Sequence, residues 1–199
     1  MVGRDPIEHR LVVTITRLSE FALLGQETDR TRYSYLPHIA RGYAFAPDLV
    51  VTRMNASANS VTVEIENRGN AAVEDAFWVD VYFDPAQPPG LNQPWTVLAD
   101  HGAVWGVTAE IEPGERLTLT TADQYFAPEY SSQPPFPVGT DVYAFVDSVD
   151  FSTTHGAVWE SNEDNNRFGP VVSAAGTSGA AAAAVRQTGS VSRETLPAR

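Results

Sequence analysis

The sequence of 199 residues contains no cysteine. Disulfide bridges, zinc sites with thiolate ligands and thiol nucleophiles are therefore excluded. A protein of this kind that works outside the cell must be held together by the size of its core or by bound ions. The apolar share of 43% is ordinary for a globular protein, so a packed core can form.

Long apolar runs are also missing. No stretch of apolar residues is long enough to cross a membrane as a helix. The start, Met1 to Pro6, lacks the apolar segment of a signal peptide. We therefore expect either a cytoplasmic chain or the mature piece of a longer exported protein.

Positive charge is scarce in the middle of the chain. Residues 46–172 hold 19 Asp or Glu and 4 Arg, within an overall net charge of −12, and lysine is absent. Binding to nucleic acid or to an anionic membrane depends on Lys and Arg that neutralise phosphate. The excess of negative charge in residues 46–172 therefore disfavours binding to nucleic acid or to an anionic membrane, and it is compatible with bound cations.

No catalytic motif stands out. The sequence has no Gly-x-Ser-x-Gly, no His-Glu-x-x-His and no glycine-rich phosphate loop. Carboxylate pairs are frequent, but an acidic surface produces them by chance, and nothing indicates the cleft that separates the two carboxylates of a glycosidase. We therefore expect a protein that is not an enzyme.

What the sequence does contain is a series of short strand patterns separated by turns. The first, Leu11 to Leu18, precedes an aromatic and proline-broken stretch that is typical of a linker. The later patterns lie at residues 49–52, 61–66, 77–83, 104–111, 116–120, 142–146 and 157–159, with 168–172 as a continuation of the last arm. No helical periodicity appears before Ser173. About seven short strands with turns between them predict an all-β, antiparallel β-sandwich.

The chain divides by composition into three parts. Residues 1–45 hold an N-terminal strand and an extended linker, residues 46–172 hold the sandwich, and residues 173–199 form a low-complexity tail rich in Ala, Gly and Ser. The composition of this tail favours a flexible segment over a helix.

A short sequence repeat links two of these strand patterns. His101–Trp105 recurs as His155–Trp159. Both copies are expected to be strand entries with a glycine at a turn, and the alternative is a metal site that pairs the two histidines.

Five segments carry a resemblance to a known family. They are Pro47–Val51, Val61–Gly69, Phe77–Tyr82, Pro113–Glu115 and Val158–Asn166. In this order they resemble the CARDB family, the cell-adhesion-related domains of bacterial surface proteins, over about two-thirds of the chain. The closing segment is the most specific of the five. The resemblance implies an immunoglobulin-like sandwich in an exported, often repetitive surface protein, and no enzymatic activity.

The stretch from Asp147 to Asn166 is dense in carboxylate and amide oxygens. Calcium takes about six to eight such ligands, so it is the one candidate cofactor. The candidate ligands are Asp147, Asp150, Glu160, Glu163 and Asn165. Their spacing does not match an EF-hand. In the alternative interpretation, these side chains accept hydrogen bonds from nearby backbone groups and stabilise a turn.

Two strand patterns carry aromatic residues on the face opposite to the expected core. These residues are Trp78, Tyr82, Tyr143 and Phe145. An immunoglobulin-like sheet places the two strands side by side, so the four side chains are expected to line one outer face. Such a face either binds a partner or is covered by another part of the chain, for which Leu11 to Leu18 is available.

These features favour an extracellular or cell-surface module for adhesion or protein interaction, whose partner is a protein or a polysaccharide. A rival function is a structural subunit of an extracellular filament or layer. In that case Leu11, Val13 and Ile15 would add a strand to the sheet of a neighbouring copy and build a homopolymer. A second rival is a carbohydrate-binding module that stacks sugars on the outer aromatic residues.

Overall fold

The computed structural model describes residues 2–5, 10–13, 45–175 and 196–198, and the chain forms two compact units, Met1–Ala40 and Arg41–Arg199. In the first unit, β1 (Val2–Asp5) pairs antiparallel with β2 (Arg10–Val13). Leu11 and Val13 therefore lie in a strand that already has a partner on one side. Ile15 and the rest of that predicted strand lie outside the described residues.

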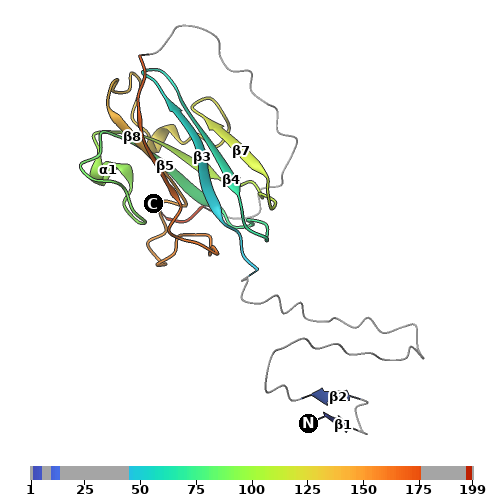
Figure 1. The fold of residues 1–199 in the computed structure, drawn as a ribbon. Coiled ribbons are helices and arrows are strands. Elements are labelled where there is room, and N and C mark those ends of the chain that lie inside the picture. The colour runs from blue at the N-terminus through green and yellow to red at the C-terminus, as the bar shows by residue number, and fades with distance from the viewer. Residues whose placement is uncertain (1, 6–9, 14–44, 176–195, 199) are drawn as a thin grey trace. The chain divides into compact units, whose positions relative to one another are not determined.

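The second unit is a sandwich of two antiparallel sheets (Figure 1). The first sheet has the order β3 (Leu49–Ala56), β4 (Val61–Asn67), β7 (Arg116–Thr120). The second has the order β6 (His101–Val107), β5 (Phe77–Phe83), β8 (Asp141–Val146), β9 (Arg167–Val172). The chain changes sheets after β4, β6 and β7, as in Greek-key sandwiches. The predicted seven-stranded antiparallel β-sandwich is confirmed.

One strand prediction is wrong. Residues 157–159 are not a strand, and β8 pairs instead with β9, from Asp141 opposite Val172 to Phe145 opposite Arg167. The backbone N–H groups of Ala157 and Val158 donate to a side-chain carboxylate, so they are not available to a sheet. The repeated pentapeptide therefore has two structures, since its first copy lies in β6 and its second in a loop.

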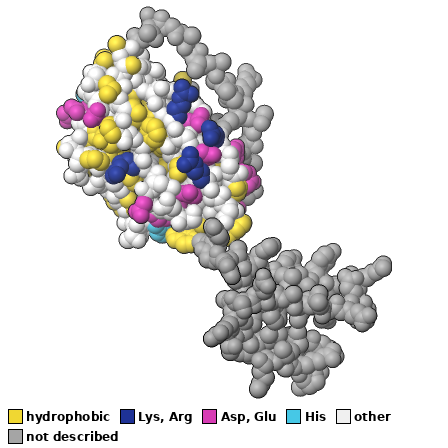
Figure 2. Space-filling view, viewed as in Figure 1, with side chains coloured by type: hydrophobic (Ala, Val, Ile, Leu, Met, Phe, Trp, Pro, Cys, Tyr) yellow, Lys and Arg dark blue, Asp and Glu magenta, His cyan; other side chains and the backbone are white. Residues whose placement is uncertain are grey.

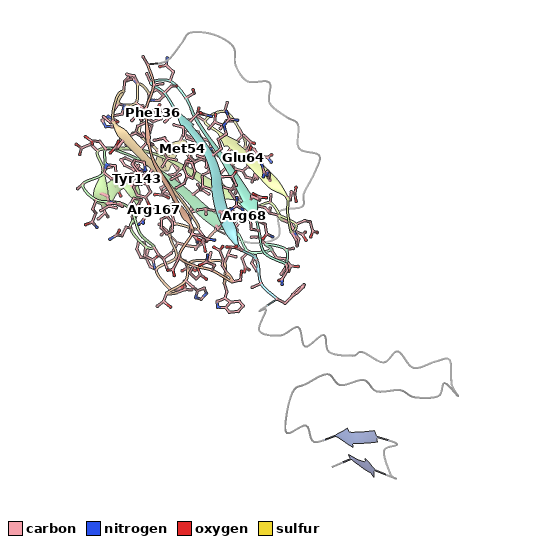
Figure 3. All side chains as sticks on the ribbon, viewed as in Figure 1. Met54, Glu64, Arg68, Phe136, Tyr143 and Arg167 are labelled. Atoms are coloured by element: carbon pink, nitrogen blue, oxygen red, sulfur yellow. The ribbon has the colours of Figure 1, made fainter. Side chains whose placement is uncertain are left out.

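The core lies between the two sheets and follows the alternation of the sequence. In β4, Val61, Val63 and Ile65 are fully buried, and the residues between them are partly exposed. At the end of the sandwich farthest from the β8–β9 connection, Phe136 stacks on Phe83 with ring centroids 4.9 Å apart (Figure 3). In β6, the indole of Trp105 is buried in the core and donates to the Thr120 carbonyl at 2.8 Å.

Strand β5 is buried on both faces, which is unusual in an antiparallel sheet. Its outer face carries Trp78, Asp80 and Tyr82, none more than 5% exposed. The cover comes from residues 84–98, which include the short helix α1 (Trp95–Leu98), from the 3₁₀ turn η1 (Pro128–Tyr130), and from the chain end. The described cover is thus a different part of the chain from the predicted N-terminal strand.

Hydrogen bonds hold this cover in place. The hydroxyl of Tyr82 donates to the Gln93 carbonyl at 2.8 Å, and the backbone N–H of Trp95 donates to the Asp80 carboxylate at 3.0 Å. The second Asp80 oxygen accepts from the Ser148 hydroxyl at 2.7 Å. The outer face of the sheet is therefore a second, smaller core that contains one acidic side chain with hydrogen-bond partners on both of its oxygens.

A fully buried asparagine closes the other sheet. The Oδ1 atom of Asn67 accepts the N–H groups of Asp48 at 3.1 Å and Gly69 at 3.0 Å. Its Nδ2 atom donates to the carbonyls of Ala71 at 2.8 Å and Ile111 at 2.9 Å. One side chain thus satisfies backbone groups of three separate segments at the end of β4.

Replacing this side chain should be costly. Asn67→Ala would remove the partner of four backbone groups, one in a buried and three in part-buried hydrogen bonds, so we expect the free energy of unfolding to fall by about 3 kcal/mol. Urea unfolding followed by circular dichroism measures the loss. The exposed Asn55→Ala is the matched control and should change the value by less than about 0.5 kcal/mol. Equal values for both variants would contradict the role of Asn67.

Candidate functional site

The acidic loop, Asp147–Asn166, connects β8 to β9 and lies at one end of the sandwich (Figure 1). Arg167, labelled in Figure 3, marks the point where the chain leaves the loop and enters β9. Connecting loops at the ends of a sandwich are where such folds usually carry function. The acidic loop is therefore the candidate functional site.

Asp147 anchors the first half of the loop. It is fully buried, has a positive φ of 52°, and follows directly on β8. Its Oδ1 accepts the N–H of Ala157 and its Oδ2 accepts the N–H of Val158, both at 2.9 Å. Gly156 lies against this carboxylate with a φ of +92°, and a Cβ at that position would overlap it. Only glycine fits there, both for its backbone angle and for its size.

Glu160 anchors the second half of the loop to the start of β3. Its side chain is 3% exposed. The carboxylate accepts the backbone N–H of Leu49 and the side-chain Nδ2 of Asn166, the latter at 2.8 Å. The neighbouring Ser161 N–H donates to the Pro47 carbonyl at 2.8 Å. The loop is therefore joined to both sheets.

Burial changes the protonation of these two anchors. It raises the pKa of Asp147 to about 7, against the opposing effect of its two backbone hydrogen bonds. Burial likewise raises the pKa of Glu160 to about 8, and the negative charges of Asp147 and Glu163 raise it further. The pKa of Glu163 is also raised, chiefly by burial. Ionising the whole cluster therefore costs free energy.

The remaining candidate ligands serve turns. Asp150 Oδ1 accepts the N–H and the hydroxyl of Ser152 at 2.9 and 2.6 Å. Glu163 Oε1 accepts the N–H of Glu160 at 2.8 Å, and Asn165 Nδ2 donates to the Asp48 carboxylate at 2.9 Å. The structure thus spreads the five predicted residues along the loop, each with its own hydrogen-bond partners.

The geometry of the acidic loop bears directly on the predicted calcium site. Within residues 45–175 and the other described segments, no three His, Asp or Glu side chains come close enough to hold a metal ion. The carboxylates of Asp147 and Glu160 already accept backbone hydrogen bonds, which a cation would have to replace. Two buried amide oxygens, Asn165 Oδ1 and Asn166 Oδ1, have no partner. The arrangement favours the turn-stabilising alternative, and the calcium site stays a prediction.

Two aromatic side chains of the acidic loop point into solvent. Phe151 is 60% exposed and Trp159 is 57% exposed. In Figure 2, hydrophobic side chains lie beside a histidine at the end of the domain where the acidic loop is found. Sequence reasoning assigned Trp159 to a strand and did not single out Phe151. The sequence held one signal for this exposure: both aromatic residues lie in an acidic, Asn-rich segment that lacks the alternation of a strand.

The four aromatic residues predicted as a binding surface lie on the expected outer face, but that face is not open. Tyr82 is 0% exposed, Trp78 5% and Phe145 7%, and Tyr143 is half-buried. Tyr82 and Tyr143 are directly opposite each other across β5 and β8, so the predicted neighbourhood of the strands is correct. The prediction that these side chains are exposed as a binding surface is therefore wrong, because residues 84–98 and η1 cover them.

We expect thermal stability to fall as the pH rises from about 4 to about 8. A carboxyl group whose pKa is higher in the folded chain than in the unfolded chain stays protonated in the folded state while it ionises in the unfolded state. Raising the pH through that window therefore favours unfolding, and stability is highest below it. Melting temperatures across the window measure the slope.

Glu160→Gln should make this slope shallower, because one of the buried titrating groups is removed. The exposed Glu112→Gln is the matched control and should keep the slope of the unchanged chain. A melting temperature that rises with pH, or the same slope in both variants, would show that the buried carboxyl groups do not control the pH dependence.

We expect calcium to leave the melting temperature unchanged in chelator-treated protein. A cation that bound the native chain alone would raise the melting temperature by mass action. Binding at this loop would first have to break the backbone hydrogen bonds of Asp147 and Glu160. Differential scanning fluorimetry with millimolar calcium, and with magnesium as control, measures the effect, and a rise specific to calcium would establish the predicted site.

Comparison with known proteins finds a similarity to a solved structure. The chain is similar to a solved structure described as the CARDB domain of a Pyrococcus furiosus protein in complex with di-metal ions. The identity is 21%, the match covers 67% of this chain and 98% of that one, and the TM-score is 0.38. No family model matches the chain, and no curated protein matches it. No helix among the described residues is long and apolar enough to cross a membrane.

Proposed function

We propose that this chain is a non-catalytic adhesion or protein-interaction module of an exported protein, and that the acidic loop is its contact surface. The observation that carries the proposal is the exposure of Phe151 and Trp159. Both lie on a loop that is held by hydrogen bonds to buried carboxylates. The loop therefore holds apolar contact residues in water without a partner in the described part of the chain.

Exposed aromatic side chains of this kind suit recognition. Trp and other large aromatic residues supply much of the binding free energy at interfaces when they become fully desolvated. The same loop also carries the acidic side chains of Asp150, which is half-buried, and Asp164, which is exposed. Charge at a rim contributes to the choice of partner and to the rate of encounter. The partner surface expected from this chemistry is apolar at its centre and basic around it.

The fixed backbone adds to this argument. A loop that is ordered before binding loses less conformational entropy when the partner arrives. The hydrogen bonds of Asp147 and Glu160 tie the loop to β8 and β3, so Phe151 and Trp159 are displayed on a preformed surface. This distinguishes the loop from a disordered segment of the same composition.

The two rival functions have less support. Sugar stacking on Trp78 and Tyr82 would require faces that are buried here, so in a carbohydrate-binding module Trp159 would have to replace them. Strand addition by Leu11, Val13 and Ile15 stays a prediction; among the described residues, β2 pairs with β1.

Replacing both exposed aromatic residues should abolish adhesion without unfolding the domain. Beads that carry the chain would be tested under flow on surfaces coated with envelope proteins of the source cells and, separately, with cellulose and chitin. For Phe151→Ser with Trp159→Ser we expect retention on protein to drop about tenfold or more. Val97→Ser removes another large side chain, 69% exposed, and is the matched control.

Equal retention of the double variant and the unchanged chain on protein would remove the acidic loop as the contact surface. Retention on polysaccharide alone, lost in the same variant, would identify a carbohydrate-binding module instead. Regular polymers in light scattering and electron microscopy would favour the filament subunit.

A further inference from the structure

The C-terminal end of the chain is seated on the outer face of the second sheet. The side chain of Leu196 packs against a cluster that contains Trp78, Val104, Ala127 and Val149. The indole Nε1 of Trp78 donates a hydrogen bond to the carbonyl of Pro197 at 2.9 Å. In Figure 1 the chain end lies against the domain near α1, in agreement with the packing of Trp95 in the same cluster.

The position under Leu196 is shaped by a glycine. Gly106 lies directly opposite Trp78 across β5 and β6, and a Cβ at Gly106 would overlap the Leu196 side chain. The leucine therefore fills a hollow that exists because β6 has no side chain at this point. Trp78 and Gly106, which are paired across β5 and β6, border this socket for the Leu196 side chain.

A second outward-facing glycine of β6 is also covered by a large side chain. Gly102 lies opposite Tyr82, and a Cβ there would overlap the Trp95 ring. Each outward glycine of β6 is thus matched by one covering side chain. Trp95 is fixed by its place in α1 next to β6. Leu196, by contrast, is separated in sequence from the nearest described strand, β9, by more than twenty residues.

The contact has the chemistry of peptide recognition. It consists of one apolar side chain in a socket and one backbone carbonyl held by an indole N–H. Leu196 and Pro197 stay half-exposed and Ala198 is exposed, so the segment lies on the domain rather than within its core. Proline after leucine restricts the backbone to an extended form, which lowers the entropy lost on binding.

We propose that the socket formed by Trp78, Val104 and Gly106 is a binding site for a leucine–proline peptide, and that the chain occupies it in cis with its own Leu196–Ala198. The site is then closed to other peptides until the chain end leaves. It lies on the outer sheet face and does not depend on the function proposed for the acidic loop. Because ligand and site share one chain, the tail competes at a high effective concentration.

Release of the chain end is tested in the full chain with Leu196→Asp. The indole N–H signal of Trp78, assigned with Trp78→Phe, should shift in the proton–nitrogen spectrum because its hydrogen bond to Pro197 is lost. Ala198→Asp adds the same charge at an exposed position two residues away and should leave the signal in place. Melting temperatures should show that both variants are folded. An unshifted signal in Leu196→Asp would overturn the proposal.

Recognition is tested by adding the peptide Glu-Thr-Leu-Pro-Ala-Arg, the sequence of residues 194–199. It should return the Trp78 signal of Leu196→Asp to its original position in a saturable way, and the same peptide with Asp in place of Leu should not. The unchanged chain should bind the peptide at least about tenfold more weakly than Leu196→Asp does, because its own residues 196–198 compete for the site. A folded Leu196→Asp chain that ignores the peptide would overturn the proposal.

Two further measurements locate the site and its occupant. Gly106→Ala should shift the Trp78 signal and should weaken peptide binding when combined with Leu196→Asp, since the new methyl group fills the socket. Light scattering of the unchanged chain over a range of concentrations should show no association that depends on Leu196. A dimer abolished by Leu196→Asp would overturn occupancy in cis, because the tail would then be seated in a second copy.

Discussion

The structure depends on one constraint: β5 carries large side chains on both of its faces and has to be covered on both. The three-stranded sheet covers one face through the main core, in which Phe77, Val79 and Val81 are fully buried. In the described part of the chain, no second sheet covers the other face. Loop residues 84–98, the turn η1 and the chain end do so instead, and this explains why connections that look like ordinary loops in the sequence are packed and hydrogen-bonded.

A second principle governs the acidic loop. In most proteins a dense group of carboxylates is a solvated surface or a cation site, but here two of the acids are used as internal acceptors. Asp147 and Glu160 replace the strand pairing that the loop lacks by accepting backbone N–H groups. Because buried polar groups must be paired, this solution lets the chain leave β8, turn and return to β9 without regular secondary structure.

Much of the fold follows from local pattern, whereas the site does not. Alternation identified the strands, and Val61, Val63 and Ile65 face the core as that pattern requires. The pairing of Ala157 and Val158 with the Asp147 carboxylate is a tertiary contact with no local signature, so the apolar residues there suggested a strand. The covered outer face had one readable signal, the outward glycines 102 and 106 of β6, since small residues on a sheet face often mark a close approach.

In the acidic loop, the residues that hold the backbone are different from the residues that face solvent, and this affects which substitutions the loop can accept. Asp147, Gly156 and Glu160 form a framework that tolerates little substitution, because all three are buried and Gly156 lies directly against the Asp147 carboxylate. Phe151 and Trp159 face outward, and their side chains are mostly free of the domain. New binding specificities could therefore arise by drift at the outward positions while the framework stays fixed. A library randomised only at those positions would sample many surfaces on one unchanged scaffold.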